Sequence, residues 1–290
     1  MKPSMLLLAA VVCACGPKTE TAPPVETPVL PEAHTLYDRF LEVTNAQESL
    51  VGVESMSMRS EMRIPAAGIA GEVVAYWKTG TDSSSAKVLV EQNIPGIGSG
   101  RVGFDGETGW SSDNMMGPRL INGRELDELL WDSQIDSEIK YKDWYSKLET
   151  KAQVQFRGED AWQVEATTKH DRVDTKYFSI ESGLMLGSAY EVESPLGPMT
   201  MEMHHSEWAE MDGLWVPKIS LISTGPVEME TEIIELNKNP ELDETLFDLP
   251  AEIEELLADQ KEKEAENESE EQDSIEAPES TEQEADQEQP

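Results

Sequence analysis

Two hydrophobic periods divide the chain, and the first is helical. From residue 35 onward, large apolar residues recur near helical spacing at Leu36, Phe40, Val43 and Leu50. A spacing close to 3.6 residues is typical of an amphipathic helix. Thr35 and Asp38 stand in a variant of the capping-box pattern. We therefore predict a helix that begins at Thr35 and ends near residue 50.

After residue 50 the period changes to two, which is the spacing of a half-buried strand. In the segment 55–64, alternate positions are apolar, namely Met56, Met58, Met62 and Ile64. The positions between them are mostly polar or charged, so one face of this strand is predicted to be buried. Residues 72–79 and 86–92 read as two further strands.

Later strand-like segments follow at short intervals. Glycine stands beside Asp, Glu or Ser in turn signals at 105–106, 158–160, 181–183 and 211–213. The segments around the later turns are 152–156, 161–166, 175–180, 184–192, 199–208, 214–223 and 227–236. Strands joined in order by hairpins form an antiparallel meander, and we predict about ten or eleven of them.

One helical segment interrupts the strands. Asn122 and Glu125 stand at capping-box spacing ahead of an apolar cluster that ends at Trp131. The segment 132–148 is ambiguous between a loop and a short helix. Near the carboxyl end, residues 251–262 are predicted to add another short helix, through Ile253, Leu256 and Leu257.

The amino terminus has the parts of a secretory signal. Lys2 supplies a positive start, residues 5–12 form an apolar run, and small residues with a cysteine follow. The two cysteines of the chain, Cys13 and Cys15, both stand here. A disulfide between residues so close together would be strained, and no further Cys or His stands nearby to complete a zinc site. Neither a redox pair nor a metal site is predicted.

Val12-Cys13-Ala14-Cys15 resembles the bacterial lipoprotein box, whose cysteine is acylated and becomes the new amino terminus. Cys15 fits that role better than Cys13, because the small residue Ala14 precedes it, whereas the branched Val12 precedes Cys13. We predict that Cys15 carries the lipid anchor. Ordinary cleavage with free secretion is the alternative.

Composition then divides the chain into four parts. Residues 1–14 are the predicted signal peptide, and residues 15–34 hold the lipidated cysteine and a proline-rich spacer. Residues 35–250 are the predicted folded domain. Residues 251–290 hold 17 acidic and 2 basic residues. Beyond residue 262 this tail has one large apolar residue, Ile275, so we predict that it is disordered.

Charge excludes some classes of partner. The chain holds 59 acidic and 22 basic residues, which gives a net charge of −37 at pH 7. Nucleic acid is therefore not an expected partner, because its binding requires Lys and Arg to replace phosphate counterions. No stretch of 18 apolar residues is present, so the anchor at Cys15, and not a spanning helix, is the predicted link to the membrane. The acidic tail allows a basic protein partner, or it serves only for solubility.

Several phrases between residues 35 and 250 resemble the LolA/LolB-like superfamily of lipoprotein carriers and related periplasmic proteins. They are "GFDGETGW" at 103–110, "YFSIESGLML" at 177–186, "EMDGLWVPKI" at 210–219 and "NPELDETLFDLP" at 239–250. The resemblance implies a mainly β, α+β fold. It is a curved antiparallel half-barrel with an N-terminal helix and a helical insert over its open face. It also implies an apolar cavity that accepts lipid or acyl chains.

Signs of enzyme chemistry are poor, and no cofactor is predicted. His204 and His205 are adjacent on a predicted strand, so their side chains face opposite sides and do not form a metal pair. The motifs of zinc proteases, serine hydrolases and P-loop proteins are absent from the sequence. Asp105 and Glu107 lie near two glycines but lack the spacing of a calcium loop. We expect a protein that is not an enzyme.

Methionine is the one unusual enrichment on the predicted strands. The candidate lining residues of the cavity are Met56, Met58, Met62, Met199, Met201 and Met203. Methionine adapts to irregular apolar partners, so these residues either line a lipid cavity or pack as ordinary core.

Together these features predict a lipid-anchored protein of the bacterial envelope, facing the periplasm, that binds lipid or an acylated ligand. Gly16, not Asp, follows Cys15, which favours the outer membrane by the enterobacterial sorting rule. The alternative is a non-enzymatic interaction or scaffold protein that uses its acidic surface and tail.

Overall fold

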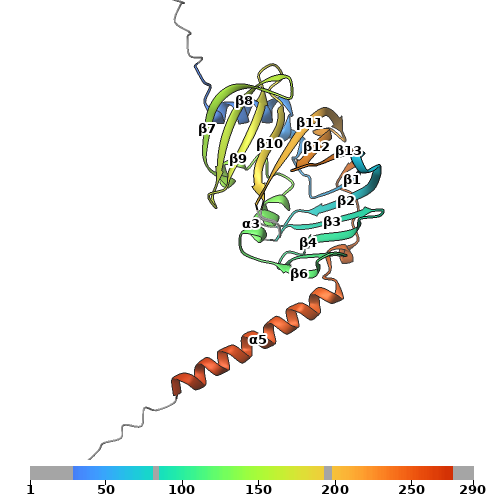
Figure 1. Ribbon diagram of the computed structural model, residues 1–290, viewed down its shortest axis with the longest axis vertical. Helices are drawn as coiled ribbons and strands as arrows, with labels where there is room; N and C mark the ends of the chain where they lie inside the picture. Colours follow the sequence, from blue (N-terminus) through green and yellow to red (C-terminus); the bar gives the residue numbers. More distant parts are fainter. Residues whose placement is uncertain (1–28, 81–84, 193–197, 277–290) are drawn as a thin grey trace, which may run out of the picture.

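One curved antiparallel sheet dominates the molecule (Figure 1). The computed structural model describes residues 29–80, 85–192 and 198–276. Across these residues the sheet has thirteen strands in the order β6-β5-β4-β3-β2-β1-β13-β12-β11-β10-β9-β8-β7, and β6 and β7 form its two edges. The sheet is curved but does not close on itself.

The strands fall into two consecutive groups. The first group is β1 (Ser55–Ile64), β2 (Ile69–Lys78), β3 (Lys87–Ile94), β4 (Gly98–Phe104), β5 (Gly109–Asp113) and β6 (Gly117–Ile121). The second group is β7 (Tyr145–Phe156), β8 (Glu159–Thr168), β9 (Val173–Ser179), β10 (Met185–Val192), β11 (Met199–Met211), β12 (Leu214–Thr224) and β13 (Val227–Lys238). Short 3-10 turns lie at Pro65–Ala67 (η1) and Glu244–Phe247 (η2).

The mainly β, antiparallel prediction is confirmed, but the predicted count of ten or eleven strands is wrong. β4, β5 and β6 are short and rich in glycine and polar residues, so their sequences show little alternation. At one of these positions, Gly103, the packing of Trp110 leaves no room for a side chain. A Cβ atom on Gly103 would lie 2.6 Å from the Trp110 indole, which faces it across the β4–β5 pair.

The meander is also split in two, because β1 pairs with β13 in the middle of the sheet. The chain therefore reaches one edge at β6 and resumes at the opposite edge with β7. Residues 122–144 make that crossing, and they contain α3 (Gly123–Asp132) and α4 (Tyr141–Trp144). The helical segment predicted from residue 122 therefore lies, in chain order, between the two edge strands.

The N-terminal helix is shorter than predicted. α1 (Ala33–Val43) begins two residues before Thr35, and its N-cap residue, Glu32, makes no side-chain capping bond. It ends early because the Thr44 hydroxyl donates to the Phe40 carbonyl at 2.8 Å and Asn45 adopts a left-handed φ of 49°. A single further turn, α2 (Ala46–Ser49), follows.

The start of α3 follows the predicted boundary, with Asn122 as the N-cap residue. Its side chain makes no capping bond, and Glu125 does not complete a capping box. Glu125 instead accepts a hydrogen bond from the guanidinium of Arg119 at 2.8 Å. The segment that was ambiguous in sequence contains α4 and the first part of β7.

The C-terminal helix is much longer than predicted. α5 (Ala251–Glu276) continues past residue 262 into the segment for which disorder was predicted. Residues 277–290 lie outside the described residues. Glu, Lys, Gln and Ala are good helix formers, which explains how a segment with few apolar residues remains helical. α5 extends away from the sheet (Figure 1). No described helix is long and apolar enough to cross a membrane.

The two faces of the sheet carry separate apolar clusters. We call the inner face the one that packs against α1. There Tyr37, Phe40, Val164 and Phe178 belong to one buried cluster. On the outer face, Leu89, Trp110, Phe247 and Ile253 form a second cluster that holds η2 and the start of α5. The inner cluster positions the site described next.

Candidate functional site

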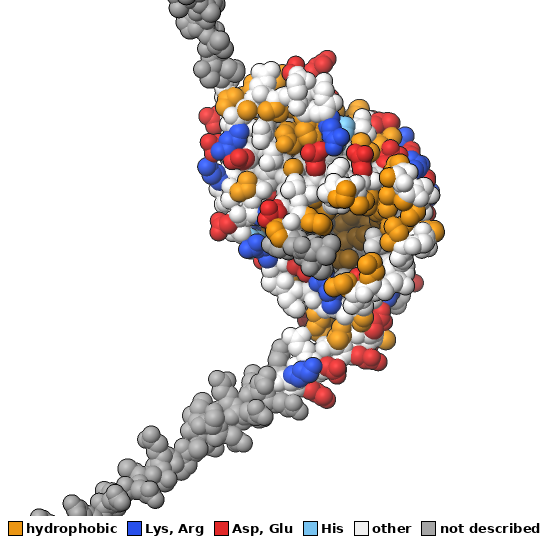
Figure 2. Space-filling view, viewed as in Figure 1, with side chains coloured by type: hydrophobic (Ala, Val, Ile, Leu, Met, Phe, Trp, Pro, Cys, Tyr) orange, Lys and Arg blue, Asp and Glu red, His pale blue; other side chains and the backbone are white. Residues whose placement is uncertain are grey.

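A cavity of about 570 Å³ lies between the inner face of the sheet and the helices. Figure 2 shows it as a hollow with hydrophobic side chains around and inside it. Strands β9 to β13 and β1 line one side, and α1, α2, α3 and α4 contribute residues to the other. Its large apolar lining residues include Phe40, Trp131, Trp144, Met185, Trp208 and Leu236.

Helix α1 forms its part of the wall through aromatic packing. Tyr37 stacks on Tyr141 with ring centres 4.3 Å apart, and it meets Phe178 edge-on at 4.9 Å. Phe40 meets Trp208 edge-on at 5.8 Å. Such pairs contribute about 0.5–1.5 kcal/mol each beyond their area burial. Spacing of three residues places Tyr37 and Phe40 on one side of α1, and this spacing explains why the amphipathic helix docks on the inner face.

Helix α3 forms another part of the wall, and polar contacts hold it there. Trp131 stacks on Trp144 with ring centres 5.0 Å apart. Glu128 lies 2.7 Å from the Arg172 guanidinium, and Asp127 lies 3.1 Å from the His170 ring nitrogen. Both contacts join α3 to the connection between β8 and β9, which contains His170 and Arg172. The lid-like position of α3 therefore depends on charged partners as well as on apolar packing.

Charged groups at one end of the cavity form a compact network. Arg172 Nε donates to Asp174 Oδ1 at 2.8 Å, while its other side contacts Glu128. The Tyr145 hydroxyl donates to Asp174 Oδ2 at 3.0 Å. Asp174 is 2% exposed, so these bonds satisfy a carboxylate that would otherwise be costly to bury. Burial and the nearby Asp174 raise the pKa of the Tyr145 hydroxyl well above its usual range.

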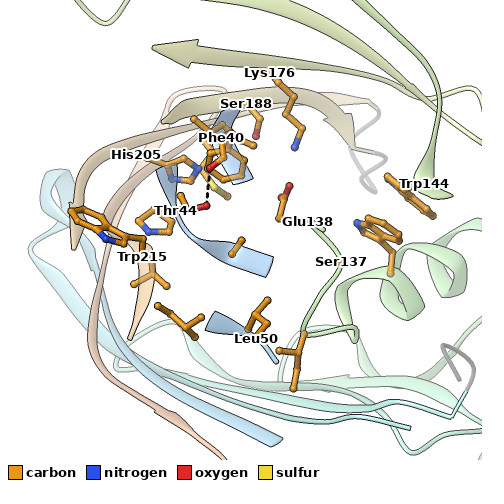
Figure 3. Close-up of a pocket in the computed structure, with 18 of the residues that line it drawn as sticks. Phe40, Thr44, Leu50, Ser137, Glu138, Trp144, Lys176, Ser188, His205 and Trp215 are labelled. Atoms are coloured by element: carbon orange, nitrogen blue, oxygen red, sulfur yellow. Dashed lines mark hydrogen bonds between the residues drawn. The ribbon is translucent and has the colours of Figure 1, made fainter. Parts of the chain in front are cut away.

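Lys176 and Ser188 lie directly opposite each other on β9 and β10, and both line the cavity. Figure 3 shows both side chains pointing into it, with Glu138 below them. Burial alone would lower the pKa of Lys176. Interactions with Tyr37, Glu138 and Asp174 outweigh this effect, so the pKa lies above its usual value. Lys176 is therefore an ammonium ion at neutral pH.

His205 also lines the cavity, in a neutral form. Its Nδ1 lies 2.9 Å from the Ser220 hydroxyl. Burial, assisted by the positive charge of Lys176 and by His204, lowers the pKa of His205 to about 4. His204 points to the other face and meets Phe156 there, as the strand alternation predicts.

We expect His205 to make the fold less stable as the pH falls from about 6.5 to about 4. The unfolded chain binds a proton near pH 6.5, whereas the folded imidazole stays neutral until about pH 4. Protons therefore favour the unfolded state in this window. The pKa shift of His205 corresponds to a loss of about 3 kcal/mol in the free energy of unfolding. Urea unfolding of wild type and His205→Gln at pH 7 and pH 4.5 measures it. If the difference in unfolding free energy between wild type and His205→Gln is the same at both pH values, the lowered pKa of His205 is contradicted.

The structure places the six candidate methionines on two strands. All six are half-buried. Met56 on β1 and Met203 on β11 line the cavity, whereas the other four do not belong to its lining. β1 pairs with β2 in unbroken register, so Met56, Met58 and Met62 share one face, as their spacing predicts. Met201 accepts a hydrogen bond from the hydroxyl of Tyr190, which lines the cavity.

Sequence reasoning missed the charged end of the cavity. Arg172, directly before β9, and Asp174 and Lys176 on β9 stand at alternate positions, and this alternation was the available signal. It reads in sequence as a solvated strand face, because charged residues are usually exposed. Cys15 lies outside the described residues, so its predicted lipidation is not addressed by the structure. Among residues 29–80, 85–192 and 198–276, no three His, Cys, Asp or Glu side chains are grouped so that they could hold a metal ion.

Comparison with known proteins identifies the fold. No protein-family model and no curated protein sequence matches the chain. A DUF1329 family protein from Desulfovibrio piger is similar in structure, with a TM-score of 0.51 and 12% identity over 74% of this chain and 97% of that protein.

Two further solved structures have lower TM-scores. A putative outer membrane lipoprotein-sorting protein domain from Vibrio parahaemolyticus has a TM-score of 0.46 and 11% identity, over 73% of this chain and 97% of that one. A LolA superfamily protein from Nitrosomonas europaea has a TM-score of 0.47 and 11% identity, over 76% of this chain and 99% of that protein. The DUF1329 family protein shares the fold of this chain, and the LolA/LolB-like resemblance of the sequence phrases stays a prediction. At these identities the likeness shows the fold alone.

Proposed function

We propose that this chain is a bacterial envelope lipoprotein, anchored through Cys15, whose inner cavity binds the acyl chain of a lipid or of an acylated ligand. It acts by binding and not by catalysis. The predicted signal peptide and lipoprotein box support the location, and Gly16 favours the outer membrane, facing the periplasm. In the superfamily that the sequence resembles, the space between half-barrel and helices accepts such chains.

The cavity is the observation that carries this proposal. Its volume of about 570 Å³ lies within the 300–1,000 Å³ range of small-molecule sites. Its walls combine large aromatic residues with Met56, Met185 and Met203, and methionine adapts well to flexible apolar partners. A chain that fills the cavity would gain about 25 cal/mol for each Å² of apolar surface removed from water.

The full chain without its first 15 residues is expected to take up an acyl probe. Purified protein is stripped of lipid under mild conditions and titrated with a fluorescent fatty-acyl probe, and native mass spectrometry then measures the mass of the complex. We expect saturable binding of one probe, and competition by an unlabelled sixteen-carbon alcohol. Absence of binding by every acyl probe to the folded protein would refute the cavity proposal.

The acidic surface supports the alternative of an interaction or scaffold protein. α5 carries a dense set of glutamates and extends from the sheet, and Ile253 and the 3.0 Å contact between Arg101 and Glu252 hold its start. A basic protein is the partner that such a helix suits. Capture of a basic partner that depends on residues 251–290 and is lost at high salt would favour this alternative.

A further inference from the structure

We propose that the ligand is an amphiphile with a negatively charged headgroup, and that Lys176 and Ser188 bind that headgroup inside the cavity. The inference rests on the proposed function, because it names the polar end of the molecule whose chain fills the apolar part. A carboxylate and a phosphate monoester share the required chemistry. The experiment below separates these two sources.

Lys176 is the charged donor of the cavity that is still available. Among the described residues, no carboxylate oxygen lies within 4 Å of its ammonium nitrogen and no hydrogen bond reaches it. Its ammonium nitrogen lies 5.9 Å from the centre of the Tyr145 ring. Arg172, by contrast, is held between Glu128 and Asp174. An anion that enters the cavity therefore meets Lys176 as its natural partner.

Ser188 supplies a second donor beside Lys176. The two residues are paired across β9 and β10, which places their side chains on the same face at adjacent positions. Ser188 is 5% exposed, and none of the hydrogen bonds within the described residues uses its hydroxyl. Its hydroxyl oxygen keeps access to the cavity, so it can donate a hydrogen bond to a headgroup oxygen next to Lys176.

Lys176 and Glu138 are the charged cavity residues that make no ion pair among the described residues, so they determine which ligand charge the cavity favours. His205 is neutral at pH 7, since its pKa is about 4. Glu138 lines the cavity without an ion pair among the described residues, and it faces Lys176 in Figure 3. Lys176 is held on a strand, whereas Glu138 lies in the connection between α3 and α4. We therefore assign Lys176 as the fixed binding group and Glu138 as the counter-charge that an anion displaces.

The cavity is polarised in a way that fits an amphiphile. Lys176 and Ser188 lie at one end in Figure 3, and Leu50 lies at the other. Leu214 and Leu236 are further apolar lining residues. A headgroup at Lys176 thus leaves its chain pointing along apolar walls.

The test compares chain-matched probes that differ only in their headgroup. Palmitate, hexadecyl phosphate, hexadecanol and hexadecylamine are titrated by calorimetry, below their aggregation limits, into the protein without residues 1–15. We expect both anions to bind about tenfold to a hundredfold more tightly than hexadecanol, which is the range for a charged hydrogen-bonded contact. Tighter binding of palmitate than of hexadecyl phosphate assigns a free fatty acid, and the reverse order assigns a phosphate headgroup.

Two variants test the residues. Lys176→Met is expected to remove the preference for anions, so that palmitate, hexadecyl phosphate and hexadecanol bind this variant with similar affinity. Glu138→Gln is expected to strengthen anion binding a few-fold. Urea midpoints close to that of wild type establish that both variants fold. Equal binding of palmitate and hexadecanol to wild type, or tighter binding of hexadecylamine, would overturn the headgroup assignment and leave the proposed cavity function intact. Failure of all four probes would overturn the proposed function itself.

Discussion

Met56→Asp is expected to weaken binding of a neutral acyl probe by about tenfold to a hundredfold, because a carboxylate in the cavity wall loses its hydration when a chain covers it. Met56 lines the cavity from β1, where it pairs with Trp77 and Lys238 on the neighbouring strands. Since Met56 is only half-buried, the substitution leaves the main apolar cluster around α1 unchanged. Hexadecanol serves as the probe, so that headgroup effects do not contribute.

Two residues of the same strand provide matched controls for this prediction. Met62 shares the face of Met56 on β1 but does not line the cavity. Ser57 faces the other side and accepts a hydrogen bond from Asn237. Met62→Asp and Ser57→Asp are expected to retain binding within about threefold, or about 0.7 kcal/mol, because neither side chain lines the cavity. Equal losses in Met56→Asp and Met62→Asp would show that the effect does not arise at the cavity.

Cys15→Ala is expected to release the protein from the membrane fraction. Each methylene group of a buried acyl chain contributes about 0.8 kcal/mol to membrane affinity, and two or more chains anchor a protein firmly. Loss of the acylated cysteine removes this entire contribution. The acidic body offers no polybasic patch to replace it. Fractionation of bacterial cells that express the full chain, followed by detection in membrane and soluble fractions, measures the change.

Cys13→Ala is the control for this assignment. Cys13 would leave with the signal peptide, so its replacement should not affect the membrane fraction. If Cys13→Ala releases the protein and Cys15→Ala does not, Cys13 carries the lipid and our assignment to Cys15 is wrong. If wild type itself is found free in the soluble fraction, ordinary secretion is the correct interpretation.

The sequence predicted the strands whose side chains alternate in character. β1 has the bounds predicted from the period of two, Ser55–Ile64, because one of its faces is buried and the other is polar. The period of two is not visible in β4 to β6, which are short and interrupted by glycine, although Phe104, Trp110 and Ile121 are buried there. A local pattern is informative only where a segment is long enough to show it.

The sequence named part of the cavity lining but not its charged end. Methionine spacing pointed to the inner face, and two of the six candidates, Met56 and Met203, line the cavity. Lys176, Ser188 and Glu138 were not singled out, because nothing in their local sequence separates an inward-facing charge from a solvated one. Their proximity depends on the pairing of β9 with β10 and on the path of the chain between α3 and α4.

By itself the sequence determined the class of fold, the helix that covers the sheet and the predicted membrane address, since these depend on composition and on short-range periodicity. Only the tertiary structure decided that β1 pairs with β13 and that the chain crosses between opposite edges of the sheet through α3 and α4. The reason is physical. Strand order and the shape of a cavity depend on contacts between residues more than a hundred positions apart, such as Met56 and Lys238, and no local pattern encodes which distant strands will meet.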